Sequence, residues 1–208
     1  MKALVILTII FSSMGEVDVQ QLINDPCFLM EESKGPCLYD IDGRDYLIHT
    51  NGKISLIDTD ITVNITLPEY FQIEGVKHET YEGDILFNFS IRNCDSASTM
   101  IVRLASDNLK IKWQTEFIAF NSSQMLIDEG AVYVAGIGTI AKIDINSGSI
   151  VWEHDGLYER DSQAFNSFIK PRRDGDLIIF EENKVATAKY FGIRKIIVNR
   201  VSGEILSK

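Results

Sequence analysis

The sequence predicts an all-β protein in which about four four-stranded antiparallel sheets, or five with a degenerate unit, form a β-propeller-like array. Two observations predict this class. An acidic residue followed by glycine recurs at intervals of 40, 47 and 45 residues, at Gly43, Gly83, Gly130 and Gly175. Each pair opens an apolar strand, and a second strand–turn–strand stretch follows in the same unit. Sheets of this kind bury their faces by packing on one another around an axis.

The third unit shows the pattern most completely. Residues Val132–Trp152 alternate between strand-like stretches and tight turns, including an Asn-Ser-Gly hairpin turn. The second unit agrees with it, because Leu104 precedes Trp113 by nine residues, as Ile143 precedes Trp152. A tryptophan buries a large area with few rotamers. Both tryptophans are therefore expected to pack between units rather than to bind a ligand.

The stretch Lys142–Trp152 resembles the repeat of pyrroloquinoline-quinone-type (PQQ-like) β-propellers, in which a strand ending in Leu-Asp, a turn with Gly and a closing Trp form the blade. The resemblance covers most of residues 36–208 and is weakest in the first unit, where Lys53–Asp58 fits but the Trp is replaced. It implies a propeller fold.

The quinone-binding members of that family have about eight blades and a calcium site. Their site motifs are not found on this chain, so no cofactor is expected. Three ways of closing the ring stay open: four blades alone, a fifth blade from residues 16–35, or two chains sharing one ring.

The N-terminal residues have the pattern of a secretory signal peptide. Lys2 precedes the apolar run Ala3–Phe11, and small residues follow up to Gly15. This run is too short to cross a bilayer, which takes about 20 residues. We expect export to the periplasm or the exterior, with cleavage near Gly15. The predicted organisation is a signal peptide (1–15), an arm or closing strand (16–35) and the repeats (36–208), at about 36–68, 72–117, 122–155 and 163–208.

The composition limits the partners. Hydrophobic residues make up 45% of the chain, and the formal net charge is -10. An acidic chain is not expected to bind nucleic acid, because neutralising phosphates requires an excess of Lys and Arg. The charge mildly favours a basic protein partner. No later segment is apolar over a length that spans a membrane, so no membrane span is expected.

Three cysteines are present. In an exported protein, Cys27 and Cys37 could pair and close a short loop, which would leave Cys94 as the odd one. The alternative is three reduced thiols.

Two long segments between strands, Ser90–Thr99 and Glu181–Gly192, fall at the same point of the repeat and should emerge on one face. The partner-binding candidates come from these segments, the residues beside them and the connection after the third unit; they are Arg92, Asp95, Tyr158, Lys189, Tyr190, Phe191 and Arg194. Aromatic rings beside Lys and Arg are typical of protein-contact hot spots. The alternative is that Tyr190 and Phe191 pack on the blade beneath them.

Catalytic and metal-binding motifs are not found in the sequence. The histidines are scattered over the units, and no nucleophile elbow, phosphate loop or zinc helix occurs. The connection Glu153–Asp161 mixes one His with acids, which is a weak metal signal. In Asp40–Asp45, acidic residues alternate around a glycine, as in some calcium-binding loops. Asp-Gly is a stronger signal for a turn before a strand, and we favour the turn. No catalytic or metal site is therefore expected.

The leading hypothesis is an exported, non-enzymatic propeller that binds a protein through one face. It would be an immunity or inhibitor protein against an exported toxin or hydrolase, or a scaffold in envelope assembly. The rival is a sugar-binding or hydrolytic propeller, which predicts that carboxylates from different blades converge at a central channel.

Overall fold

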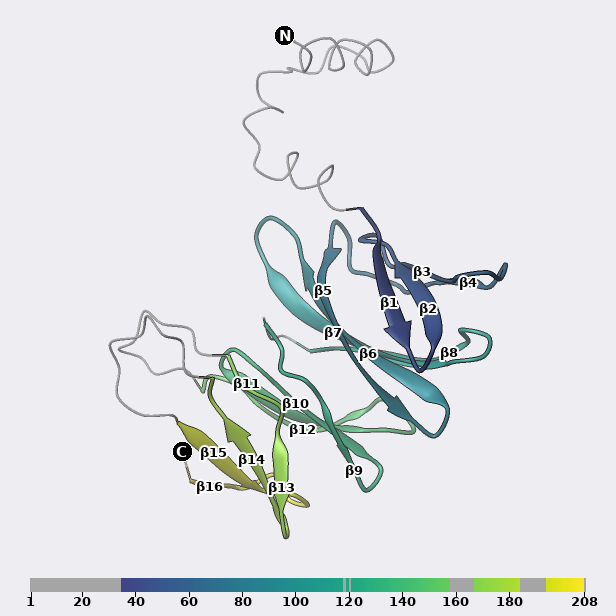
Figure 1. Cartoon of the computed structure of the whole chain (residues 1–208). Coiled ribbons are helices and arrows are strands. Elements are labelled where there is room, and N and C mark those ends of the chain that lie inside the picture. Colours follow the sequence, from purple (N-terminus) through teal and green to yellow (C-terminus); the bar gives the residue numbers. More distant parts are fainter. Residues whose placement is uncertain (1–34, 118, 120, 158–166, 184–193, 208) are drawn as a thin grey trace, which may run out of the picture. The chain divides into compact units, whose positions relative to one another are not determined.

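The computed structural model describes residues 35–117, 119, 121–157, 167–183 and 194–207 (Figure 1). The chain divides into two units, Met1–Gly35 and Pro36–Lys208, and the strands found among the described residues belong to the second. The described residues form four separate sheets, each of four antiparallel strands. The predicted all-β class with four four-stranded units is confirmed. Over the described ranges, no helix is long and apolar enough to cross a membrane.

Each sheet is called a blade and numbered in chain order. Blade 1 contains β1 (Cys37–Ile41), β2 (Arg44–Ile48), β3 (Lys53–Leu56) and β4 (Thr62–Asn64). Blade 2 contains β5 (Gln72–Tyr81), β6 (Asp84–Arg92), β7 (Ala97–Ala105) and β8 (Ile111–Phe117). Blade 3 contains β9 (Leu126–Asp128), β10 (Ala131–Gly136), β11 (Thr139–Asp144) and β12 (Ile150–His154). Blade 4 contains β13 (Arg172–Asp174), β14 (Leu177–Glu181), β15 (Lys195–Asn199) and β16 (Ile205–Ser207).

Strands that follow one another in sequence are also neighbours in each sheet, so every blade is a meander. The first and third turns of a blade therefore lie at one end, called the turn end. The second turn and the connection to the next blade lie at the opposite end, called the loop end. In blades 1 to 3 the acidic-Gly pair forms the first turn, with a positive φ at both residues, as a type I′ hairpin requires. In blade 4 the turn is Gly175-Asp176, one residue later than predicted.

Alternate residues of the middle strands face opposite neighbours. In β6, Ile85 packs toward blade 1 and Leu86 toward blade 3. In β10, Val132 packs toward blade 2 and Tyr133 toward blade 4. Because blades 2 and 3 are covered on both faces, β6 and β10 are buried almost throughout. Within the described residues, no hydrophobic cluster joins blade 4 to blade 1.

The two tryptophans lie between blades, as predicted. Trp113 of blade 2 packs on the third turn of blade 3, where a Cβ added to Gly148 would come within 2.7 Å of the indole. Trp152 of blade 3 lies in the same way on Gly203 of blade 4, also at 2.7 Å. Glycine is required at these two turns because the ring occupies the space of a side chain.

Candidate functional site

The segment Ser90–Thr99 is not the long loop that the sequence predicts. β6 continues to Arg92 and β7 begins at Ala97, so the hairpin turns over Asn93–Ser96 alone. The physical reason is the apolar alternation, which continues in both strands and keeps them packed on blade 1. The hairpin of blade 2 therefore extends at the loop end as a paired ribbon.

The two candidates on this hairpin are exposed at its tip. The Arg92 side chain is 45% exposed and its NH1 lies 3.9 Å from Glu74 Oε1, an ion pair of long geometry. The Asp95 amide donates to Asn93 Oδ1 at 2.9 Å, which fixes the turn and leaves the Asp95 carboxylate at the surface. Both side chains are accessible to a partner.

Arg194 lies instead in a contact within the chain. Its Nε and NH2 donate to Glu182 Oε1 at 2.9 and 2.6 Å, and NH2 also donates to the Leu157 carbonyl at 2.6 Å. The two side chains are 17% and 6% exposed. Arg194 thus closes the base of the β14–β15 connection. Four other candidates, Tyr158, Lys189, Tyr190 and Phe191, lie outside the described residues.

Tyr70, in the connection between blades 1 and 2, was not among the candidates. Its side chain is 83% exposed and its backbone has a positive φ of 64°, an unusual conformation for a tyrosine. The residues around it are fixed, because Phe71 donates its amide to the Pro68 carbonyl at 3.1 Å and Ile73 to the Thr50 carbonyl at 2.8 Å. The Phe71 ring packs against the core between blades 1 and 2. An anchored loop therefore holds a tyrosine ring out in solvent.

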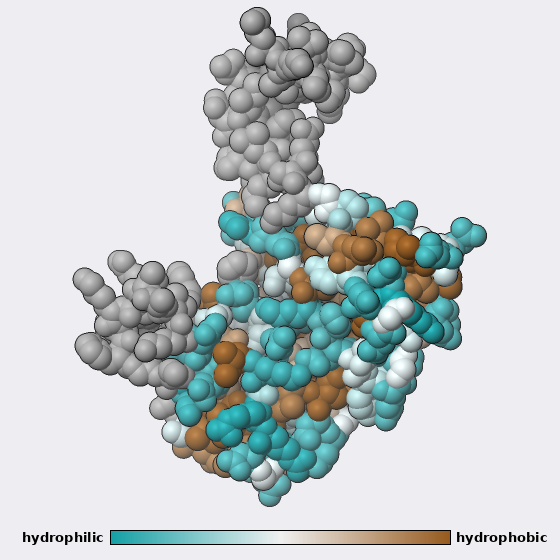
Figure 2. Space-filling view, in the orientation of Figure 1, coloured by the Kyte–Doolittle hydropathy of each residue, from teal (hydrophilic) through white to brown (hydrophobic). Residues whose placement is uncertain are grey.

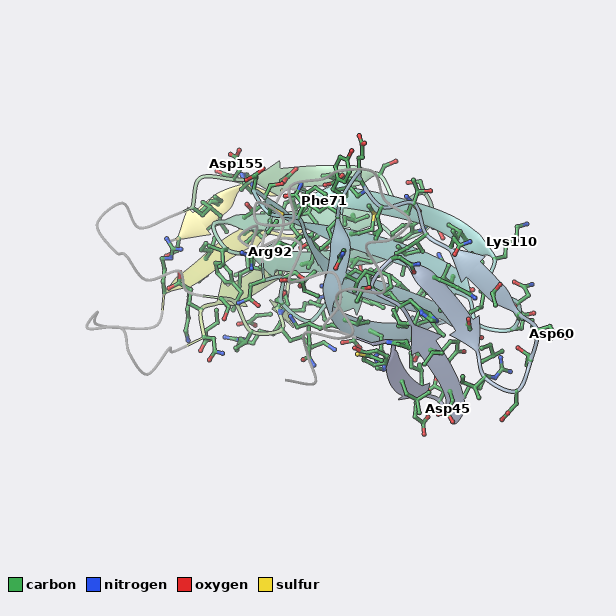
Figure 3. The ribbon with its side chains drawn as sticks, turned by 90° about the horizontal axis from the view of Figure 1, so that it is seen from above. Asp45, Asp60, Phe71, Arg92, Lys110 and Asp155 are labelled. Carbon is green, nitrogen blue, oxygen red and sulfur yellow. The ribbon has the colours of Figure 1, made fainter. Side chains whose placement is uncertain are left out.

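Tyr70 and Arg92 belong to the same corner of the loop end. Gln72, two residues after Tyr70, is the register partner of Arg92. Figure 3 shows Phe71 and Arg92 from above, on the connection into β5 and at the end of β6. In Figure 2, apolar areas interrupt the hydrophilic surface at separate places rather than as one large patch. Tyr70, Arg92 and Asp95 form what we call the blade 2 corner.

The first strands of blades 2 and 3 carry carboxylates of the kind that the rival hypothesis needs, and a cation holds each of the two nearest blade 4. Lys170 contacts Glu79 at 2.6 Å, and Arg173 contacts Asp128 at 2.9 Å. Hydrogen bonds from Arg173 and Arg200 also lower the pKa of Glu129 below its usual value. Carboxylates that are neutralised in this way are not set up as a general acid and base pair.

The Asp40–Asp45 segment forms a turn, as favoured from the sequence. The Gly43 amide donates to Asp40 Oδ1 at 3.0 Å, and β1 and β2 pair on either side. Glu153 and His154, expected in a connection, belong to β12, and His154 Nε2 lies 2.6 Å from the Gly203 carbonyl of blade 4. Among the described residues, no group of three or more His, Cys, Asp or Glu is placed to hold a metal ion.

The predicted Cys27–Cys37 disulfide is wrong. Cys37 is an exposed free thiol at the start of β1, whereas Cys94, in the β6–β7 turn, is disulfide-bonded. Cys27 lies outside the described residues. The short sequence distance between Cys27 and Cys37 favoured their pairing, but Cys94 lies at the exposed tip of the long hairpin, where the sequence pattern predicted an open loop.

No protein-family model and no curated protein matches this chain. Among solved structures it is similar to a quinohemoprotein alcohol dehydrogenase of Pseudomonas putida HK5, with a TM-score of 0.46 and 10% identity over 72% of this chain and 34% of that one. It is also similar to the quinohemoprotein alcohol dehydrogenase of Comamonas testosteroni, with a TM-score of 0.44 and 16% identity over 64% of this chain and 20% of that one.

The chain thus spans about a third and a fifth of the lengths of these two enzymes.

Proposed function

We propose that this protein is an exported, non-enzymatic binding module that recognises another protein through the loop end of its blades. The observation that carries the proposal is Tyr70, a ring 83% exposed on a loop that is anchored on both sides. Tyrosine is enriched at the centres of protein interfaces because it adds a large contact area at a small entropic cost. A loop backbone that is already held in place loses little further freedom on binding.

The chemistry of the blade 2 corner supports the same proposal. Arg92 and Asp95 place one charge of each sign on the hairpin whose end pairs with Gln72, two residues after Tyr70. The long Arg92–Glu74 contact leaves the guanidinium available for a bidentate partner. The predicted candidates Lys189, Tyr190 and Phe191 fall in the β14–β15 connection, which leaves blade 4 at the loop end. The proposed surface therefore includes both segments.

Within this class, the immunity or inhibitor role on an exported toxin or hydrolase is the version we favour. The net charge of -10 would speed capture of a basic partner. Export is proposed from residues 1–15. Mass spectrometry of the protein from its native host should find a mature chain that begins near residue 16, outside the cytoplasm. A full-length chain in the cytoplasm would rule out export.

The experiment that tests binding is a capture from native extract with the mature chain, compared with two variants. Tyr70→Asn removes the ring but keeps a residue that tolerates a positive φ. We expect it to retain its melting temperature within about 1 °C and to lose most of the captured partner, as should the Tyr190→Ala/Phe191→Ala double variant.

The matched control is Lys110→Ala at the turn end, which should capture as much as the wild type. Equal capture by all variants would rule out the loop end as the binding surface. Turnover of an oligosaccharide by the purified chain would instead favour the sugar-processing rival.

A further inference from the structure

Two cysteines lie at the loop end of the first two blades and differ in redox state. Cys37 begins β1, and because β1 runs to the first turn at the turn end, its start lies at the loop end. Cys94 lies in the β6–β7 turn, the second turn of blade 2, which is also at the loop end. Cys37 is an exposed free thiol, whereas Cys94 is disulfide-bonded.

The partner of Cys94 follows by elimination. The sequence contains three cysteines, at positions 27, 37 and 94, and the structure is of a single chain. Because Cys37 is free, Cys27 is left as the one sulfur to which Cys94 can be bonded. The length of the chain permits this pairing, because the ten residues from Cys27 to Cys37 reach at most about 35 Å when extended, and Cys37 lies at the loop end.

The turn that carries Cys94 is held in shape by its own hydrogen bonds. The Asn93 side-chain oxygen accepts from the amides of Asp95 and Ser96 at 2.9 and 2.7 Å, and from the Ser96 hydroxyl at 3.1 Å. The Asn93 amide donates to the Ser96 carbonyl at 3.0 Å. Bonds of this kind are typical of a turn that begins with Asn. What the disulfide adds is therefore a covalent link between this tip and the chain that precedes blade 1.

Blade 1 is the part of the structure that this link encloses. A bond between residues 27 and 94 closes a covalent loop that contains all of blade 1 together with β5 and β6. Blade 1 packs on blade 2 through one hydrophobic cluster. The second residue of β2 is the exposed Asp45, whereas β6 and β10 have the buried Ile85 and Val132 at this position. Among the described residues, no hydrophobic cluster joins that outer face of blade 1 to another blade.

The loop that carries Tyr70 depends on blade 1. Ile73 donates its amide to the Thr50 carbonyl of blade 1 at 2.8 Å, and the Phe71 ring packs against the cluster between blades 1 and 2. If blade 1 loosens, this anchor is lost and the Tyr70 ring is no longer held in place. The other two members of the blade 2 corner lie within two residues of Cys94. The disulfide therefore acts on the whole corner.

We propose that a Cys27–Cys94 disulfide is a redox switch of the blade 2 corner, a regulatory role that rests on the proposed function. In the oxidised chain the bond ties blade 1 to blade 2 and keeps the corner in its binding conformation. In the reduced chain blade 1 loosens and binding weakens. When the bond forms, the two thiols lose two electrons and two protons. The disulfide of a thiol–disulfide oxidoreductase outside the cytoplasm takes them up and becomes a dithiol. Binding competence is thus acquired on export.

Peptide mapping without reduction tests the pairing. Free thiols of the mature chain from its native host are alkylated, and the denatured chain is cut with trypsin. Each cysteine then falls in a different peptide, because trypsin cleaves after Lys34, Arg44, Arg92 and Arg103. We expect the Cys27 peptide to be linked to the Cys94 peptide, and the Cys37 peptide to carry the alkyl group. A link that includes the Cys37 peptide, a link between two Cys94 peptides, or three alkylated cysteines would overturn the pairing.

Serine variants test what the bond does to the structure. Cys27→Ser, Cys94→Ser and the double variant should all lower the melting temperature by the same amount, about 5–10 °C, because each removes the same bond. Cys37→Ser is the matched control and should stay within about 1 °C of the wild type. In hydrogen exchange, blade 1 amides should exchange about tenfold faster in Cys94→Ser, and blade 4 amides should not change.

Two further readouts test the switch and separate it from the proposed function. The Phe71 and Ile73 amides, which anchor Tyr70, should also exchange faster in Cys94→Ser; wild-type rates there would overturn the switch whether or not a partner is captured. Cys27→Ser, which leaves the Cys94 side chain in place, should capture the native partner at least about fivefold less than the wild type. Equal capture would also overturn the switch. If the wild type captured no partner while mapping and exchange came out as expected, the proposed function would fail and the disulfide-controlled conformation would stand.

Discussion

The junction between blades 2 and 3 and the junction between blades 3 and 4 use the same repeat positions but differ in how completely their polar atoms are paired. In the first, Trp113 Nε1 donates to the Ile145 carbonyl at 2.7 Å. In the second, Trp152 Nε1 and the Tyr133 hydroxyl are buried and have no hydrogen-bond partner among the described residues. Burial raises the pKa of Tyr133 to about 12, so its hydroxyl stays neutral at physiological pH.

The ion pairs at the two junctions also differ, in how deeply they are buried. Between blades 2 and 3, Asp84 is 3% exposed and is held by Arg103 Nε at 2.6 Å and by Lys112 Nζ at 2.7 Å. Between blades 3 and 4 the ion pairs of Arg173 and Arg200 lie closer to the surface, where salt bridges stabilise little. The two junctions share a tryptophan on a glycine turn, and in each a cationic side chain donates to the carbonyl that follows the next blade's third strand. The other polar contacts are particular to each junction.

The largest effect should come from the shared steric element. Gly148→Ala places a Cβ within 2.7 Å of Trp113 at a φ of +73°, and Gly203→Ala does the same to Trp152 at +75°. Strain of the backbone and displacement of the ring should together cost about 2–5 kcal/mol in the free energy of unfolding. Urea denaturation measures this. Both variants should lose a similar amount.

The matched control is Gly130→Ala, where φ is +76° and nothing lies within 4 Å of the added Cβ. It should cost only the backbone strain, about 1–2 kcal/mol. If all three glycine variants lost the same stability, contact with tryptophan would not be what these turns require.

This steric element is also the part of the molecule that the sequence predicted best. The Trp and Gly positions recur at fixed spacing, and so do the turn glycines, which is why four blades could be recognised. Arg103 and Asp84 carry no such signal, because they are 19 residues apart and meet only through the register of β6 and β7. A single buried ion pair does not recur along the sequence, so no periodic pattern predicts it.

The candidate site was predicted less well, for two physical reasons. Arg92 was placed correctly at the surface, but Arg194 is drawn inward by Glu182, a pairing that depends on how the chain leaves β14 and returns to β15. Tyr70 was missed because its exposure follows from a positive φ and from the anchoring of Phe71. Neither is visible in the sequence, although two adjacent aromatic residues in a connection between units are a usable hint.

The second-largest loss of stability should come from removing the cation that pairs with the buried Asp84. Arg103→Met leaves Asp84 buried with Lys112 as its only nearby cation among the described residues, and should cost about 2–4 kcal/mol, since breaking a buried pair leaves an uncompensated charge. Lys142→Met at the equivalent position of blade 3 removes a single bond to the Arg200 carbonyl and should cost about 1 kcal/mol. Urea denaturation of both variants gives the comparison.

A double variant makes this test stricter. Asp84→Asn in the Arg103→Met background removes the stranded charge and should restore part of the lost stability. If Lys142→Met were as damaging as Arg103→Met, the buried carboxylate would not explain the difference between the junctions.

The smallest expected effect is the difference in stability loss between Trp113→Phe and Trp152→Phe. Trp113→Phe loses apolar area and the hydrogen bond to the Ile145 carbonyl, whereas Trp152→Phe loses a similar area but removes an indole N–H that has no partner among the described residues. A buried hydrogen bond contributes about 1 kcal/mol, and an unpaired buried donor costs about 1–3 kcal/mol. Because Trp152 is only partly buried, the low end of that cost applies to it. The two terms add, so we expect Trp113→Phe to be the more damaging by about 2 kcal/mol in chemical denaturation. An equal loss in both would mean that Trp152 Nε1 is paired in solution, and the two junctions would then be alike in their polar atoms as well as in their packing.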